Sequence, residues 1–345
     1  MNGPTRFALI ICAVLLSILA ASFSGSVFEP KEARPVVNWQ RRYTDLFQVE
    51  IPRGDSHAVC VLSERIQCVN VRTGKTISET LTETSGVVIR PSDNQVFAQD
   101  ANFPSRIYQF SLPSLTICST LTFDRPLAQV CRRRVVFGEG SEFFTLDVSC
   151  NLVRCSIEPS ECQTICTKAS IEACAGERLT DPSRITVVDV AEERVRFLFW
   201  GVIYIVDLTN GEISKCRMTP LETQDLFEPI GDNFLCLSHM GVLEFSSAEQ
   251  AKLIMPLTNA LCPTVYFPMH NAAITACNGL QLKPGGPDPC EFRLETSGEV
   301  IRWQHDVYVK ELRLIHDGKF VTWGHNHLAL WDAKGKIVDL KRKED

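Results

Sequence analysis

Short runs of apolar residues, separated by turn residues, dominate the chain beyond residue 35. Residues 58–62, 106–110, 195–200 and 319–323 are examples, bounded by Gly, Asn, Asp or Pro. They are rich in Val, Ile, Thr and aromatic residues, which favour strands, and helical periodicity is scarce. The pattern therefore predicts an all-β fold of many short strands, which means a sandwich, a barrel or a propeller.

One hairpin pattern recurs along the chain. An apolar residue is followed by a polar or acidic residue, a short turn that contains glycine, a charged residue and another apolar residue. The copies lie at 69–77, 206–213, 294–301 and 331–338, with turn glycines Gly74, Gly211, Gly298 and Gly335. Glycine is expected there because such turns need a positive φ. The glycines are separated by about three, two and one repeats of roughly 40 residues, close to the length of a propeller blade.

Degenerate copies at 110–117, 146–153 and 243–254 fill the gaps. Seven units result, at 57–80, 93–122, 133–156, 194–217, 233–255, 272–303 and 319–340. Over residues 36–342 the chain resembles the β-propeller superfamily, in particular its WD-repeat and quinoprotein-like members. Trp331-Asp332 stands where a WD dipeptide would, and the Gly74 and Gly211 turns are similar to those of quinoprotein-like blades. No Gly-His signature occurs at the spacing of WD repeats, and none of the four turns has the docking Trp of quinoprotein-like blades. The resemblance implies an all-β, seven-bladed β-propeller.

The ends of the repeat array suggest how the ring closes. The last unit shows strands at 319–323, 327–331 and 336–340, and the segment 36–43 could supply its outer strand. Such an N-terminal strand would leave only short, protected edges. A pair of stacked β-sandwiches is the alternative. One insertion, 157–183, breaks the period and is either a functional loop or a disulfide-pinned surface loop.

The N-terminus has the layout of an export signal. Arg6 precedes the apolar segment 7–21, and small residues follow. We expect a signal peptide at 1–22 and a linker at 23–35, with 343–345 as a C-terminal tail. The alternatives are a single membrane anchor, since no charge lies between Arg6 and Glu29, and a buried helix. Either a signal peptide or an anchor places the propeller outside the cytosol, as a secreted or lumenal protein or as a single-pass membrane protein.

Cysteine usage agrees with export. The chain has 15 Cys, of which Cys12 lies in the apolar segment, so an even number remains. With an export signal, that number predicts disulfides, and buried free thiols are the alternative. No C-x-x-C occurs, which argues against zinc and thioredoxin-type sites. Sequence does not fix the connectivity, and the candidate pairs are Cys60 with Cys68, Cys118 with Cys131, Cys150 with Cys155, Cys216 with Cys236, and Cys262 with Cys277.

Few residue patterns point to chemistry. The net charge of -6 argues against a general nucleic-acid binder. His325 and His327 alternate on a predicted strand and are weak metal candidates, with the connection between two strands as the alternative. The arginine clusters 41–42 and 132–134 could bind phosphate or sulfated glycans, or could be solvated strand ends.

No esterase elbow, zincin helix, P-loop or EF-hand loop is present, and no cofactor is expected. We therefore expect a non-enzymatic protein–protein interaction scaffold, with its protein partner on a propeller face. The alternative is an extracytoplasmic hydrolase or lyase with its site at the central channel. Converging carboxylates or histidines there would favour an enzyme, and an aromatic-rimmed face would favour a partner surface.

Overall fold

The structure is a computed structural model. It describes residues 36–51, 56–90, 92–191, 193–200, 202–215, 223–230, 233–238, 241–245, 251–257, 262–278, 290–296, 300–305, 307–316, 318–324 and 326–333. The chain divides into two units, Met1–Arg34 and Pro35–Asp345. The predicted signal peptide or anchor, the linker and the tail lie outside the described residues. Within the described part, no helix is long and apolar enough to cross a membrane.

The second unit contains seven four-stranded antiparallel sheets. The first three, each from its inner to its outer strand, are β2 (Gln48–Glu50), β3 (His57–Val61), β4 (Arg65–Asn70) and β5 (Thr76–Leu81); β6 (Thr84–Arg90), β7 (Gln95–Asp100), β8 (Arg106–Ser111) and β9 (Thr116–Thr122); and β10 (Val136–Phe137), β11 (Glu142–Leu146), β12 (Leu152–Ser156) and β13 (Glu161–Cys166).

The next three sheets are β14 (Ile185–Ala191), β15 (Arg194–Phe199), β16 (Val202–Asp207) and β17 (Ile213–Lys215); β18 (Thr223–Ile230), β19 (Asn233–Ser238), β20 (Gly241–Phe245) and β21 (Ala251–Pro256); and β22 (Thr264–Phe267), β23 (Ala272–Asn278), β24 (Cys290–Glu295) and β25 (Val300–His305). The seventh sheet is β26 (Glu311–His316), β27 (Lys319–Gly324), β28 (His327–Asp332) and β1 (Val36–Arg42). Short helices are α2 (Lys168–Ala175), η2 (Pro182–Arg184) and η3 (Pro268–His270).

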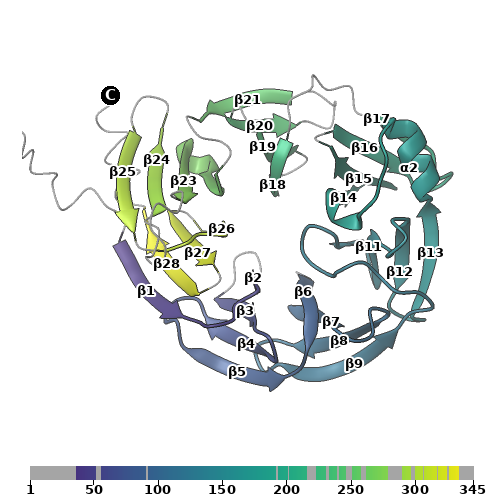
Figure 1. Ribbon diagram of the computed structural model, residues 1–345, viewed down its shortest axis with the longest axis horizontal. Coiled ribbons are helices and arrows are strands. Elements are labelled where there is room, and N and C mark those ends of the chain that lie inside the picture. Colours follow the sequence, from purple (N-terminus) through teal and green to yellow (C-terminus); the bar gives the residue numbers. More distant parts are fainter. Residues whose placement is uncertain are drawn as a thin grey trace, which may run out of the picture. The chain divides into compact units, whose positions relative to one another are not determined.

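The sheets follow one another around a ring, with β2 and β6 near its middle and β5 and β9 along its outer edge (Figure 1). Among the described residues, apolar clusters join six pairs of neighbouring sheets. The ring of Phe97 on β7 lies 6.3 Å from that of Phe143 on β11, and Phe267 on β22 lies 6.1 Å from Phe320 on β27. The core thus lies between sheets, where strands such as β3 and β7 are buried on both faces while the outer strands β5 and β9 are largely exposed. The alternative of two stacked sandwiches is wrong.

The predicted closure by the N-terminal strand is confirmed. Strand β1 pairs antiparallel with β28, which places Val37 opposite Trp331. The indole of Trp39 reaches the first sheet, where it donates to the carbonyl of Val71 at 2.6 Å. Gly74 has a φ of 69°, as the turn pattern predicts, and a Cβ there would lie 2.7 Å from the Trp39 ring.

Gly211 also has a positive φ, of 74°, whereas Gly298 and Gly335 lie outside the described residues. The predicted strand 336–340 lies outside them too. The last sheet instead takes Glu311–His316 as its inner strand.

The boundaries of the repeats needed two further corrections. The predicted units start at the second strand of most sheets, because the turn motif used to count them lies between later strands and the inner strands carry none. The segment 157–183 is only partly an insertion, since β13 within it is the outer strand of the third sheet. Helix α2 follows, begun by Thr167, whose side chain accepts from the Ser170 amide, and ended by Gly176 at a φ of 73°. Ile171 of α2 packs in the apolar cluster between the third and fourth sheets.

Candidate functional site

Strand direction defines two faces of the ring. Because neighbouring strands are antiparallel, the connections from one sheet to the next emerge at the same end as the loops between second and third strands. We call this end the crossover face; its described loops include 43–47, 101–105, 123–135, 147–151, 167–184 and 307–310, together with residue 200. The remaining loops form the opposite face.

Exposed aromatic side chains gather on the crossover face. Phe47, Phe103, Trp200 and Tyr308 are between 48% and 57% exposed, and all four lie in its loops. Within the described part of the chain, they are the large aromatic residues with that degree of exposure. Exposed apolar residues toward the opposite face, such as Ile117 and Met269, are aliphatic. The crossover face therefore has the aromatic rim that is typical of protein interfaces.

Cationic side chains lie against three of these aromatic positions. The guanidinium carbon of Arg106 is 4.5 Å from the centre of the Phe103 ring, and that of Arg184 is 4.8 Å from the centre of a Trp200 ring. Such cation–π contacts orient both partners. Lys310 donates its ammonium to the backbone carbonyl of Phe47 at 3.2 Å. Each contact places a cationic group beside an aromatic residue, and the Arg106 guanidinium also donates to the Asp100 carboxylate at 3.4 Å.

A charged cluster lies on the inner strands. Arg313 of β26 donates to Glu50 of β2 at 2.8 Å and to Glu311 at 3.0 Å. Arg313 and Glu50 are both buried, so their ion pair links the seventh sheet to the first away from water. Burial alone would raise the pKa of Glu311, but the charges of Arg313, Arg133 and Arg132 and a hydrogen bond from Arg313 outweigh it and lower that pKa. Glu311 is therefore ionised at neutral pH.

The arginine cluster 132–134 lies in the crossover loop that precedes β10, and the buried side chain of Gln99 holds this loop. Its amide nitrogen donates to the carbonyls of Leu127 at 3.1 Å and Ala128 at 3.3 Å. Its amide oxygen accepts from the backbone N–H of Val130 at 3.0 Å. Gln99 is 1% exposed, so it is a positioning residue for the arginine-bearing loop.

Comparison with solved structures agrees with this geometry. The β-propeller domain of Cps50 (Swd1) from Myceliophteria thermophila superposes with a TM-score of 0.60 at 8% identity, covering 87% of this chain and 99% of that one. This chain is a seven-bladed β-propeller. The computationally designed Ika8 protein matches with a TM-score of 0.48 at 11% identity and covers 83% of each chain. No family model matches the propeller, and no curated protein does.

One disulfide is formed among the described residues of the propeller. Cys155 and Cys162 lie opposite each other on β12 and β13, with their Cα atoms 4.3 Å apart. The predicted pair of Cys150 with Cys155 is therefore wrong. Cys150 packs instead in the apolar cluster between the third and fourth blades.

Two more candidate pairs are kept apart by the fold. Cys60 lies opposite Gln67, and Cys68 lies opposite Val59, so the two thiols point to opposite sides of the first blade. They pack in different junctions between blades. Cys118 is exposed on the outer strand β9, whereas Cys131 lies in a crossover loop. These predictions are corrected accordingly.

Cys262 and Cys277 are brought together. The backbone N–H of Ala276 donates to the carbonyl of Pro263 at 2.9 Å, which places the two cysteines opposite each other at the end of the sixth blade. Their thiols share a hydrogen bond, which lowers the pKa of Cys277 and raises that of Cys262. Both are reduced in the structure. Of the last candidate pair, Cys216 lies outside the described residues and the side chain of Cys236 does as well.

Of the two histidines predicted as weak metal ligands, the structure describes His327 alone. His325 lies outside the described residues. His327 is buried at the start of β28, with its Nε2 atom 3.4 Å from the Thr322 hydroxyl, and burial lowers its pKa to about 4. In the part of the chain that the structure describes, no group of three His, Cys, Asp or Glu residues could hold a metal ion.

The aromatic rim was not found from the sequence. Its members come from different blades and share no motif. The one local signal is an aromatic residue close to an arginine within a turn, as Phe103 is to Arg106.

Proposed function

We propose that this propeller is an extracytoplasmic, non-enzymatic scaffold that binds a protein partner on its crossover face. The observation that carries the proposal is the gathering of four half-exposed aromatic residues in the loops of that face. Aromatic residues and arginine are enriched at protein interfaces and among the residues that contribute most to affinity. A rigid ring of sheets holds these loops in place, which lowers the entropic cost of binding.

The residues of the aromatic rim indicate which groups a partner surface would offer. Phe103 with Arg106, and Trp200 with Arg184, each present an apolar ring beside a guanidinium group. A complementary partner offers apolar side chains to the rings and carbonyl or carboxylate oxygens to the guanidinium donors.

The carboxylates on the inner strands support a binding role better than catalysis. Glu50 and Glu311 both pair with Arg313. A general acid at neutral pH needs a raised pKa, and the pKa of Glu311 is lowered. This pairing gives them a structural role, and no described contact favours the alternative of a hydrolase or lyase.

Location outside the cytosol rests on the apolar segment 7–21 and on the cysteine content. The Cys155–Cys162 disulfide is of a kind that persists in oxidising compartments, whereas the other cysteines whose side chains the structure describes are reduced thiols. Intact mass of protein made in secretory cells, before and after reduction, tests this part. Loss of residues 1–22, with thiols unreactive until reduction, is expected. Full-length protein with free thiols would contradict export, and a full-length, membrane-extracted form with disulfides would indicate an anchor.

Two double variants test the partner surface. Phe103→Ser with Trp200→Ser removes half of the rim, and Ile117→Ser with Met269→Ser is the matched control on exposed residues toward the opposite face. We expect recovery of partner proteins with the tagged propeller to fall at least about tenfold for the rim variant and to stay unchanged for the control. Equal recovery with both variants would refute a partner on the crossover face.

A further inference from the structure

A pocket of about 520 Å³ opens between the third and fourth blades. It is lined by the loops after β10 and β14, so it belongs to the opposite face and is separate from the aromatic rim. Its volume lies within the range of ligand-binding clefts. Phe137, Val190 and Leu208 give it an apolar lining.

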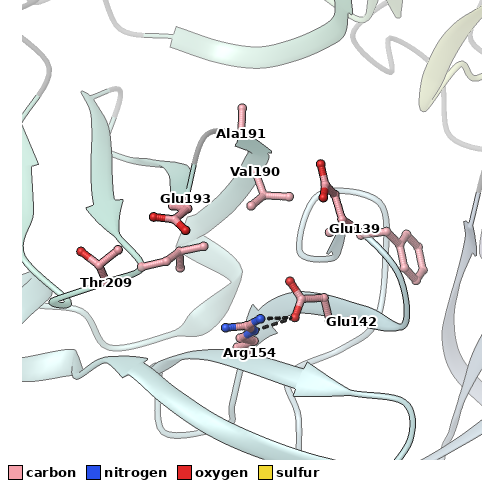
Figure 2. A pocket seen from close by; sticks show the side chains of 10 residues that line it. Glu139, Glu142, Arg154, Val190, Ala191, Glu193 and Thr209 are labelled. Carbon is pink, nitrogen blue, oxygen red and sulfur yellow. Dashed lines mark hydrogen bonds and ion pairs between the residues drawn. The ribbon is translucent and has the colours of Figure 1, made fainter.

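The charged side chains that line the pocket carry a net negative charge. Glu142 is matched by Arg154, whose Nε donates to it at 2.6 Å. The carboxylates of Glu139 and Glu193 have no hydrogen-bonding or ion-pair partner among the described residues. Figure 2 shows these two glutamates on opposite sides of the pocket, with the Arg154–Glu142 pair below them. The pocket therefore presents two unneutralised carboxylates above an apolar lining.

A backbone turn places one of the two glutamates at the pocket. Glu193 has a φ of 57°, a conformation that Gly or Asn adopts at lower cost, and its carbonyl accepts from the Leu208 N–H at 2.8 Å. The turn thus places a charged residue at the rim of the pocket although an uncharged one would fit the backbone better.

We propose that this pocket binds an alkylammonium group, supplied by a lysine side chain of a protein segment or by a free diamine. The aliphatic chain lies on Phe137, Val190 and Leu208, and the negative charges of Glu139 and Glu193 on the two sides of the pocket attract the ammonium. A metal is not the expected occupant, because no group of metal-ligating residues occurs among the described residues.

The test uses the full chain and NMR. The backbone amide of Ala191 and the side-chain Nε–H of Arg154 report on the pocket. The probes are Nα-acetyl-lysine methylamide, 1,5-diaminopentane and, as a neutral control, the lysine probe with its side chain acetylated. We expect saturable shifts with the two ammonium probes, a weak affinity that falls with added salt, and no saturable shift with the neutral control.

Variants separate charge from folding. Glu139→Gln and Glu193→Gln should each weaken binding about two- to fivefold, and together by about tenfold. Glu193→Asn should do the same while easing the backbone turn, so a loss of binding there does not come from unfolding. Glu161→Gln, at an exposed position on β13, is the matched control and should leave binding unchanged.

Every outcome of this test either supports or overturns the proposed ammonium site. Binding of both ammonium probes, or of one of them, supports the site, and the stronger probe identifies a peptide lysine or a free diamine as the source. Equal shifts with the acetylated probe, unchanged binding in the Glu139→Gln, Glu193→Gln double variant, or no saturable shift up to about 20 mM would overturn the proposal.

Discussion

The ion pair that links the seventh blade to the first should carry a large share of the stability of the ring. Arg313→Met removes the guanidinium and leaves Glu50, which is 4% exposed, as a buried charge without its partner. Breaking a buried pair in this way costs about 3–5 kcal/mol. We therefore expect the free energy of unfolding at pH 7 to fall by about that amount, measured by urea titration.

The matched control for this variant is Arg154→Met. Arg154 also pairs with a glutamate, but its side chain is 42% exposed and its partner, Glu142, belongs to the same blade. An exposed pair contributes up to about 1 kcal/mol. If the two variants lose equal amounts, or if Arg313→Met loses less than about 1 kcal/mol, the reasoning on the inner cluster is refuted.

The acid dependence of this deficit gives a second readout. The pKa of Glu311 is lowered in the folded protein, so its stabilisation is present above its unfolded pKa of about 4.3 and is lost as the pH falls below it. In Arg313→Met, the carboxylates that have lost Arg313 become neutral when they are protonated, so the destabilisation by their unpaired charges disappears at low pH. The difference between wild type and variant should therefore shrink between pH 7 and pH 4. A difference that is independent of pH would point to lost packing instead of charge.

Three further predictions concern the closing strand, a buried histidine and a disulfide. Gly74→Ala should lower the free energy of unfolding, measured in urea, by about 3 kcal/mol, because a Cβ there would displace the Trp39 indole of the closing strand. Gly176→Ala is the control, with a similar φ but open space around it, and should lower it by about 1 kcal/mol. Equal losses in the two variants would contradict this role of Gly74. The pKa of His327 is about 4 in the folded protein, so between pH 6.5 and 4 the folded protein binds fewer protons there than the unfolded chain does. The free energy of unfolding should therefore fall by up to about 3 kcal/mol as the pH is lowered over this range. His327→Gln should flatten that part of the curve of stability against pH, and an unchanged curve would contradict a buried neutral imidazole. After expression in secretory cells, Cys262 and Cys277 should be recovered as one cross-linked peptide pair, and alkylation of both without reduction would show that they remain thiols.

The parts of the fold that were predicted correctly are those that local chemistry determines. The turn at Gly74 needs a positive φ, and its spacing from Gly211 reveals the repeat length. The closing strand followed because the last unit lacked an outer partner. Both arguments use residues that are close in sequence or counted along it.

The inner strands were missed for two reasons. β2 has 3 residues and β10 has 2, so neither shows a period, and longer ones such as β6, with 7 residues, lie outside the turn motif that defined the repeats. The same limit explains the segment 157–183, where β13 looks like part of a loop after Pro159. Strand pairing, not composition, assigns these segments to the ring.

The disulfide errors come from register. Cys60 and Cys68 are on paired strands, but a shift of one residue sends their side chains to opposite sides. Cys155 bonds Cys162 across a turn that was counted as part of the insertion. The strand register brings Cys262 and Cys277 opposite each other, but both are reduced thiols in the structure, so their disulfide stays a prediction.

The candidate site depends on contacts between distant residues. Arg313 and Glu50 are 263 residues apart in the chain, and only closure of the ring brings them together. Likewise Phe103 and Trp200 come from different blades, and their shared face exists only once strand directions are known. Sequence could name the arginine cluster at 132–134 but could not place it beside Glu311.

Site-specific photocrosslinking tests the central claim most directly. A photoreactive phenylalanine analogue is placed at Phe103 or Trp200 on the crossover face, and at Ile117 or Met269 as exposed controls toward the opposite face. The propeller is expressed in secretory cells, irradiated and purified. We expect the same cross-linked partner from both rim positions and none from the controls. A partner captured only from the control positions, or equally from all four, would contradict the assignment of the crossover face as the binding surface.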